Sequence, residues 1–353
     1  MISILIATAT SFIITIFATP VAIRTLRKHN IGQFIQEEVE DHAHKRGTPT
    51  MGGVVIIFAV VAGYIVSHFR VWEFGTGPNL RLLGFPGQGW LALFAFVGMG
   101  AIGFFDDFVK YARKQNMGLS KRWKFLGQLV IAVLFAWGAV ALGTSTELSF
   151  TRELGIDLGP WLYGLLVLFL LTAAANAVNL TDGLDGLVAG SGGLVFGAFV
   201  LIAFWQSRNP SFYEVEGAVE LATVAASLVG AALGFLWWNA APARIFMGDV
   251  GSQAFGGALA AIALLTNTQL LLIFLGGLYV MTTLSVILQV FTFRVWGKRI
   301  FRMAPIHHHF ELKGWPETTI IVRFWILAGL GVAVGIGLFY GDFLRATNGG
   351  VLP

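Results

Sequence analysis

The sequence predicts an all-α polytopic membrane protein, and three observations support this prediction. Hydrophobic residues make up 56% of the 353 and charged residues only 12%, whereas a typical soluble domain carries about 25% charged residues. The mean hydropathy is +0.76. The apolar residues are gathered into stretches of about 20, the length that a helix needs to cross a bilayer. Cysteine is absent, which excludes disulfides and thiolate chemistry.

Ten apolar stretches predict ten transmembrane helices. The first stretch has neither a basic region before it nor a small-residue cleavage site, so we expect a retained span and not a signal peptide. No linker, repeat or low-complexity segment divides the chain, which predicts a single domain over residues 1–353. In chain order the expected helices cover 2–22, 51–69, 89–105, 125–143, 160–178, 187–205, 218–237, 250–266, 269–292 and 319–340.

Two segments depart from a plain helical pattern. Residues 144–159 alternate apolar and polar with turn residues between them, which predicts a small outer β-hairpin, with an irregular loop as the alternative. The stretch 269–292 runs without a break into residues 293–299, which contain Trp and cations suited to a membrane interface. We expect this helix to bend or tilt near Gly276-Gly277 or beyond. A straight span with a snorkelling basic end is the alternative.

The basic residues predict the orientation of the spans. Loops 23–50, 106–124, 238–249 and 293–318 hold 17 of the 23 Lys and Arg residues. Because cytoplasmic loops carry the excess of positive charge, we expect both termini to be extracytoplasmic. These four loops and the short segment 179–186 are then cytoplasmic, and the polar clusters of the chain share one membrane face.

Paired acids form the first two of these clusters. Asp106 and Asp107 end an apolar run, and Asp182 and Asp185 belong to two Asp-Gly pairs three residues apart. Carboxylates that emerge from lipid beside a basic loop suggest a divalent cation and a phosphorylated substrate. For Asp182 and Asp185, capping of the next helix is the alternative.

The third cluster spans residues 246–252. Asp249 lies at the start of a predicted helix, where a carboxylate can simply cap the helix. A cap does not explain the neighbouring Phe246, an aromatic in a polar loop that could stack on a planar base.

The two remaining clusters suit phosphate oxygens. His307, His308 and His309 are consecutive, so they cannot all face one ion from a single helix or strand, which argues against a zinc site. Imidazoles can instead bond phosphate or sugar oxygens, with a solvated surface patch as the alternative. The segment 44–53 contains Lys45 and Thr50 and could hold a phosphate at a helix start. Together the clusters predict magnesium-assisted phosphoryl transfer from a nucleotide to an acceptor in the bilayer.

The motifs also resemble those of the phospho-N-acetylmuramoyl-pentapeptide transferase family. This family is part of the superfamily that transfers N-acetylhexosamine 1-phosphates to polyprenyl phosphate. The resemblance covers nearly all of the expected cytoplasmic face, at residues 44–53, 105–108, 118–124, 176–186, 246–252, 285–290, 299–303 and 304–316.

The resemblance implies a reaction. Phospho-MurNAc-pentapeptide would move from UDP-MurNAc-pentapeptide to undecaprenyl phosphate, giving lipid I and UMP in the first membrane step of peptidoglycan synthesis. The implied cofactor is Mg²⁺, and the implied location is the bacterial cytoplasmic membrane. A homodimer is compatible with this expectation, and nothing in the sequence points to nucleic acid.

The resemblance further implies roles for single residues. Asp249 resembles the magnesium ligand, Asp106 the residue that assists attack by the lipid phosphate, and Asp107 its partner in positioning metal or substrate. The residues matched to substrate binding are Lys110 at a phosphate, Lys45, Thr50, Asn179, Asp182, Asp185, Asn239 and Phe246 at the nucleotide, Ser252 and Gln289 at its edge, and His307, His308 and His309 near the sugar and pyrophosphate. The acceptor lipid is expected in a groove beside the bent helix that ends at Asp106 and Asp249.

Other functions remain open at this point. A related HexNAc-1-phosphate transferase shares the paired aspartates. A prenyl-transferring enzyme would need a second aspartate at its usual spacing after Asp106-Asp107, which is missing. A transporter would line a pathway with charges inside the membrane, whereas here the acids lie at helix ends.

Overall fold

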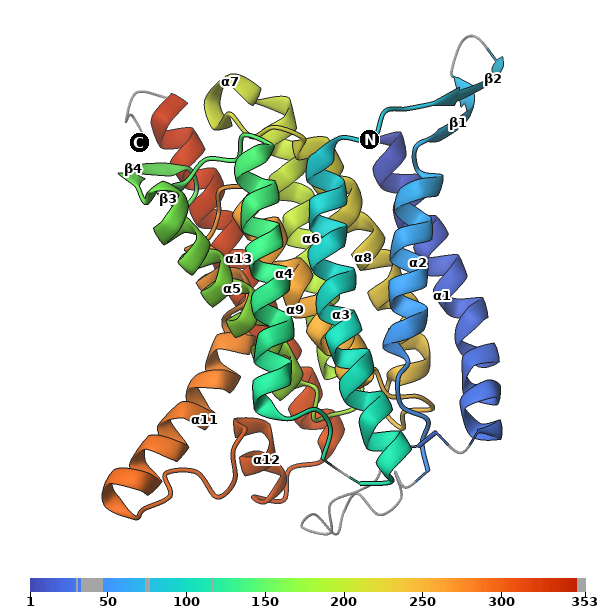
Figure 1. Ribbon diagram of the computed structural model, residues 1–353, viewed down its shortest axis with the longest axis vertical. Helices are drawn as coiled ribbons and strands as arrows, with labels where there is room; N and C mark the ends of the chain where they lie inside the picture. Colours follow the sequence, from blue (N-terminus) through green and yellow to red (C-terminus); the bar gives the residue numbers. More distant parts are fainter. Residues whose placement is uncertain (30, 33–46, 74–76, 116, 348–353) are drawn as a thin grey trace.

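The computed structural model describes residues 1–29, 31–32, 47–73, 77–115 and 117–347, which form a bundle of long helices (Figure 1). Its helices are α1 (Ile2–Lys28), α2 (Gly53–Val66), α3 (Gly87–Arg113), α4 (Lys121–Ala141), α5 (Gly159–Thr181), α6 (Leu187–Arg208), α7 (Pro210–Tyr213), α8 (Ala218–Asn239), α9 (Gly248–Leu265), α10 (Leu272–Leu275), α11 (Gly277–Trp296), α12 (Ile306–Glu311) and α13 (Glu317–Thr347). Its strands are β1 (Phe69–Glu73), β2 (Gly77–Leu82), β3 (Glu147–Ser149) and β4 (Glu153–Asp157).

The predicted fold class is confirmed, and each of the ten expected spans corresponds to helix. Among the described residues, nine helices are long and apolar enough to cross a membrane. The exception is α2, which is apolar but has only 14 residues, fewer than the roughly 20 that a span across a full bilayer needs. The chain is therefore a multi-pass membrane protein.

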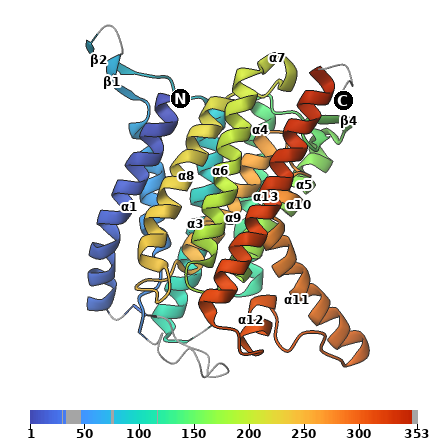
Figure 2. The ribbon, with the colours of Figure 1, turned by 180° about the vertical axis from the view of Figure 1, so that it is seen from behind.

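The two ends of the bundle differ in character. The start of α1 and the end of α13 lie at the same end, as the sequence predicted, and the short helix α12 lies at the other (Figures 1 and 2). We call this second end the α12 end. The C-terminal ends of α3 and α5 and the N-terminal end of α9 all point toward it.

Helix α9 forms the centre of the bundle. Every residue from Val250 to Leu265 is buried, and many of them are Gly or Ala. Small residues let helix backbones approach closely inside a membrane. At Gly103 of α3, an added Cβ would lie 2.1 Å from the carbonyl oxygen of Asp249. The start of α9 therefore lies directly against α3.

Two small hairpins lie at the end of the bundle that carries the termini. The hairpin predicted at 144–159 is confirmed, with β3 and β4 antiparallel and Glu147 opposite Asp157. It is anchored to the bundle, because Arg152 forms an ion pair with Asp342 of α13 at 2.9 Å. The hairpin of β1 and β2 was not predicted from the sequence.

The expected bend near Gly276 is confirmed. The predicted ninth span is divided at this glycine into the single-turn helix α10 and the longer α11. After the break, α11 leaves the bundle and extends away from it (Figure 1). Ile287, Phe291 and Val295 on α11 are exposed. The lipid groove expected beside this helix stays a prediction.

Candidate active site

Three carboxylates meet at the α12 end of the bundle. Asp106 and Asp107 belong to the last turns of α3 and Asp249 to the first turn of α9. One oxygen from each of the three lies within 4.8 Å of the others. Asp106 and Asp107 are buried, and the Asp249 side chain is only 18% exposed. The sequence prediction that these distant acids form one site is supported by this arrangement.

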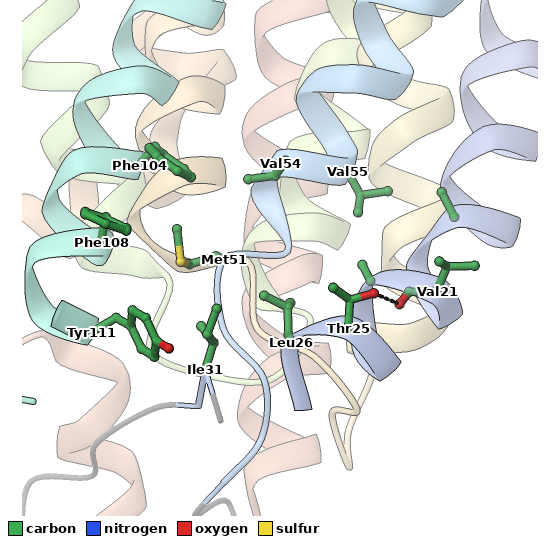
Figure 3. A pocket seen from close by; sticks show the side chains of 12 residues that line it. Val21, Thr25, Leu26, Ile31, Met51, Val54, Val55, Phe104, Phe108 and Tyr111 are labelled. Carbon is green, nitrogen blue, oxygen red and sulfur yellow. Dashed lines mark hydrogen bonds between the residues drawn. The ribbon is translucent and has the colours of Figure 1, made fainter. Parts of the chain in front are cut away.

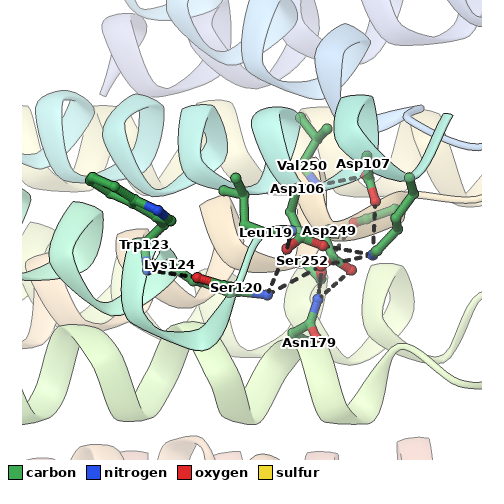
Figure 4. Close-up of polar contacts among 12 residues, drawn as sticks. Asp106, Asp107, Leu119, Ser120, Trp123, Lys124, Asn179, Asp249, Val250 and Ser252 are labelled. Atoms are coloured by element: carbon green, nitrogen blue, oxygen red, sulfur yellow. Dashed lines mark hydrogen bonds and ion pairs between the residues drawn. The ribbon is translucent and has the colours of Figure 1, made fainter. Parts of the chain in front are cut away.

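Two lysines neutralise part of this negative charge (Figure 4). Lys110 Nζ lies 2.8 Å from Asp106 Oδ2, 3.3 Å from Asp107 Oδ1 and 3.2 Å from Asp249 Oδ2. Lys124 Nζ, from α4, lies 3.2 Å from the same oxygen of Asp249. Three carboxylates and two ammonium groups leave a formal charge of −1 in a largely buried site, which favours a further cation.

Neutral donors fix the remaining carboxylate oxygens. The backbone amide of Leu119 donates to Asp106 Oδ1 at 3.0 Å, and that of Val250 donates to Asp107 Oδ2 at 3.3 Å. The side-chain amide of Asn179 donates to Asp249 Oδ1 and to Ser252 Oγ, both at 2.9 Å. Of the residues predicted to bind substrate, Asn179, Ser252 and Lys110 are therefore in direct contact with the acidic cluster or with each other.

Asp182 and Thr50 lie beside the cluster. Burial raises the pKa of the Asp182 carboxyl to about 8, and the negative charges of Asp249, Asp107 and Asp185 contribute to the same shift. A Cβ added at Gly248 would lie 2.6 Å from Asp107 Oδ2 and 3.0 Å from Thr50 Oγ1. Both residues therefore lie close to the carboxylates, and their binding to substrate stays a prediction.

Asp185 and Asn239 hold two loops together. Asp185 Oδ2 accepts a hydrogen bond from the amide of Ala243 at 2.8 Å. Asn239 Oδ1 accepts one from the amide of Gly186 at 3.1 Å, and its Nδ2 donates to the carbonyl of Ile245 at 2.9 Å. These contacts tie loop 182–186 to loop 240–247. Substrate binding by the two residues stays a prediction, and the structure gives them a positioning role.

Phe246 lies half-buried in the loop that leads to Asp249. Its amide donates to the carbonyl of Pro49, and its carbonyl accepts from the amide of Gly52, at 2.8 and 2.9 Å. The phosphate-binding segment predicted from the sequence therefore runs alongside the loop that carries the aromatic. Lys45, the predicted cation of that segment, lies outside the described residues.

The three histidines occupy one turn of helix and face different partners, as the sequence argument required. His307 is buried against the 182–186 loop, because a Cβ at Gly183 would lie 2.4 Å from His307 Nε2. His308 Nδ1 contacts Glu311, and His309 Nδ1 accepts from the amide of Arg302. A purely solvated patch is thus wrong for His307. Desolvation lowers the pKa of His309 below its usual value, and the positive charges of Lys313 and Arg302 lower it further.

Gln289 lies on α11 and bonds the backbone of the segment that follows this helix. Its Oε1 accepts from the amides of Ile300 and Phe301 at 3.1 and 3.0 Å, and its Nε2 donates to the carbonyl of Phe301 at 2.9 Å. The side chain therefore holds the segment that leads to α12. Its predicted place at the edge of the nucleotide pocket stays a prediction.

Lys124 was missed as a site residue, although it ends the motif 118–124. Its place in the sequence, directly before the expected span 125–143, is where basic residues are common at a membrane edge. Only the packing of α4 against α3 brings its ammonium group to Asp249.

An apolar cavity of about 590 Å³ lies beside the last turns of α3 (Figure 3). Its walls come from α1, α2, α3 and the segment before α2, and include Phe104, Phe108 and Met51. Phe104 and Phe108 flank Asp107 along α3, and their rings are stacked with centroids 6.1 Å apart. The cavity therefore presents carbon surface within one helical turn of the carboxylates.

The family model described as Glycosyl transferase family 4 matches residues 90–267. A motif described as phospho-N-acetylmuramoyl-pentapeptide-transferase signature 1 matches residues 45–57. The phospho-N-acetylmuramoyl-pentapeptide-transferase of Frankia casuarinae is 47% identical over 362 aligned residues, covering 98% of this chain and 99% of the relative. The chain belongs to the phospho-N-acetylmuramoyl-pentapeptide-transferase family.

Further relatives agree with this assignment. The phospho-N-acetylmuramoyl-pentapeptide-transferases of Beutenbergia cavernae and Streptomyces griseus are 46% and 45% identical, and the alignments cover 98% and 96% of this chain. The resemblance drawn from the motifs is therefore confirmed. The transferase signature includes Thr50 and the start of α2, and the family model includes Asp106, Asp107 and Asp249.

Proposed function

We propose that the protein transfers phospho-MurNAc-pentapeptide from UDP-MurNAc-pentapeptide to undecaprenyl phosphate, forming lipid I and UMP. Its relatives carry the transferase name over nearly their full length. The single structural observation that supports the proposal best is the meeting of Asp106, Asp107 and Asp249 with two lysines at the ends of membrane helices. A site of this kind can hold a phosphorylated ligand where lipid and water meet.

The donor set fits magnesium. Carboxylate oxygens are the ligands that Mg²⁺ prefers in proteins, usually one or two of them with substrate phosphates and water completing the shell. Asp249 and one oxygen each of Asp106 and Asp107 would hold the ion, because these oxygens lie within 4.8 Å of one another. When bound, magnesium would neutralise the charge on the donor pyrophosphate and on the departing UMP.

The side chains around the metal divide the remaining work. Lys110 and Lys124 offer ammonium groups to phosphate oxygens. Asn179, which also donates a hydrogen bond to Ser252, orients Asp249 through its side-chain amide. The acceptor phosphate is largely ionised at neutral pH, since the second pKa of a phosphate monoester is about 6. Asp106 and Asp107 are therefore needed chiefly to position metal and substrate.

The proposed donor site extends from the carboxylates toward Phe246. The uracil would stack on this ring, and the pyrophosphate would lie at the acidic cluster. His307 contacts loop 182–186, so the histidines of α12 would line the same region. His308 and His309 would then bond sugar or phosphate oxygens.

The membrane placement follows from the same proposal. A nucleotide donor is found in the cytoplasm, so the α12 end would face the cytoplasm of a bacterial cell and both termini would lie outside. The concentration of Lys and Arg in the loops of the α12 end agrees with the positive-inside rule. The exposed apolar faces of α11 and the cavity beside Asp107 both offer carbon surface to a prenyl chain.

The test is release of UMP by the purified protein in detergent. UDP-MurNAc-pentapeptide, a polyprenyl phosphate and Mg²⁺ should together give UMP and lipid I, and omission of any one should stop the release. Asp249→Asn should abolish release without changing the elution volume of the folded protein. Release from UDP-N-acetylglucosamine but not from the MurNAc donor would favour the related HexNAc-1-phosphate transferases instead. No release under any condition would contradict the proposal.

A further inference from the structure

Lys110 occupies the centre of the acidic cluster. Its ammonium nitrogen lies between 2.8 and 3.3 Å from one oxygen of each of the three carboxylates. In the described part of the chain, these are the carboxylates that could hold a metal ion together. The second oxygen of each carboxylate already accepts a hydrogen bond, from Leu119, Val250 or Asn179. A cation shared by the three acids would therefore use the oxygens that the ammonium group contacts.

The two cations cannot share this position. Magnesium binds oxygen at about 2.0–2.1 Å and demands near-ideal octahedral geometry. An ion that contacts all three carboxylates must draw their oxygens inward from separations of up to 4.8 Å. The nitrogen of Lys110 would then lie inside the coordination shell of the ion, where an ammonium group has no lone pair to offer.

Charge leads to the same conclusion. The three carboxylates with Lys110 and Lys124 carry a formal charge of −1, and adding a divalent cation would make it +1. If Lys110 moves out, the formal charges of the three acids, Lys124 and the divalent ion sum to zero. Because uncompensated charge is costly in a largely buried site, the departure of Lys110 favours binding of the ion.

Lys110 has room to move. Its side chain is 29% exposed, more than that of Lys124 at 20%. A lysine carries its charge on a flexible four-carbon stem, so the ammonium group can leave the carboxylates while α3 stays in place. The nearest new anion would be a phosphate oxygen of the substrate bound to the ion.

We infer that Lys110 is an exchangeable counter-ion: it holds the three carboxylates together until a divalent cation replaces it, and then transfers its contact to a substrate phosphate. This inference rests on the proposed magnesium site. It assigns Lys110 a positioning role that precedes phosphate binding. It also predicts that Lys110 competes with the metal that the reaction needs.

The test measures divalent-cation binding directly. Mn²⁺ serves as the probe, and its binding to the purified, substrate-free protein at pH 8 is followed by electron paramagnetic resonance. The wild type should bind Mn²⁺ saturably, and Asp249→Asn should not. Lys110→Met should bind Mn²⁺ at least about tenfold more tightly than the wild type, equivalent to about 1.4 kcal/mol. The matched control is Lys121→Met, which removes the same charge from an exposed site at the start of α4 and should bind as the wild type does.

A second measurement needs no substitution. Reductive methylation of the wild type, read by mass spectrometry, should modify Lys110 faster when Mg²⁺ is present, while Lys121 should not change. Unchanged or weaker Mn²⁺ binding by Lys110→Met, or a Lys110 whose methylation is insensitive to Mg²⁺, would overturn the exchange and leave the metal site standing. Absence of Mn²⁺ binding that depends on Asp249 would overturn the magnesium site and the exchange together.

Discussion

A substitution at Asn239 can show whether this residue binds substrate or positions the loops of the site. It is the last residue of α8 and is only 3% exposed. Its side-chain amide is bonded at both ends, to the amide of Gly186 and to the carbonyl of Ile245. The loop after Ile245 leads directly to Asp249. We therefore expect Asn239→Ala to loosen the loops that carry the site as well as to weaken any contact with the donor.

The cost can be worked out from these two bonds. In Asn239→Ala the Gly186 amide and the Ile245 carbonyl both lose their partner, and both residues are buried. A buried polar group left unpaired costs about 1–3 kcal/mol, so the substitution should destabilise the fold by about 2–6 kcal/mol. Net stabilities of folded domains are about 5–15 kcal/mol. The loss should therefore be easy to detect.

The assay is the midpoint of thermal unfolding in detergent, measured beside the Michaelis constants. The control is Asn176→Ala. Asn176 is exposed on α5, and its amide donates within its own helix to the carbonyl of Thr172, so this change should leave the midpoint near that of the wild type. Asn239→Ala should lower the midpoint clearly and reduce kcat. If the midpoint is unchanged and only the KM for the donor rises, Asn239 contacts the donor and the positioning role is wrong.

Four further predictions concern single residues of the site. Phe246→Ala should raise the KM for the donor about 5- to 150-fold with a smaller effect on kcat, because stacking contributes about 1–3 kcal/mol per base; a pure kcat defect would count against the stacked uracil. Gly103→Ala should lower the unfolding midpoint and the activity, since its Cβ would meet the Asp249 carbonyl oxygen at 2.1 Å, whereas Gly164→Ala, with no atom within 4 Å of the added Cβ, should do neither. The pKa of Asp182 in the folded state is about 8, above its unfolded value, so the stability associated with its neutral form is lost as pH rises toward 8. In metal-free buffer, Asp182→Asn should therefore raise the unfolding midpoint relative to wild type more at pH 9 than at pH 6. An equal effect at both pH values would contradict the raised pKa. Asp106→Asn should lose transfer equally across pH 6–9, and recovery at high pH would show that Asp106 acts in deprotonation.

The helices and the acidic residues of the site could be predicted from the sequence for physical reasons. A bilayer requires long apolar helices, and it makes a carboxylate at the edge of such a helix costly without a partner or a function. Asp106, Asp107 and Asp249 were recognisable for this reason. The bend at Gly276 was recognisable because the apolar run contains adjacent glycines and continues without a break into residues 293–299, which contain Trp and cations.

The partners of these acids could not be predicted in the same way. Lys124 looks like any basic residue at a membrane edge, and only the packing of α4 brings it to Asp249. Asn239 and Asp185 are polar residues in loops, and their side chains turned out to bond backbone groups of other loops. The β1–β2 hairpin was missed because its residues fall between two predicted spans and show no clear alternation. Each of these features depends on contacts between segments far apart in the chain.

The apolar core and the polar site are parts of one arrangement. Asp249 can join Asp106 and Asp107 only because α9 starts against α3, and that approach requires the missing side chain at Gly103. Once the three carboxylates are this close, their repulsion has to be balanced, and Lys110 and Lys124 supply the balance from α3 and α4. A larger residue at Gly103 would therefore separate the acids, and loss of both lysines would leave them uncompensated. The packing of small residues thus controls how strongly the site attracts a cation.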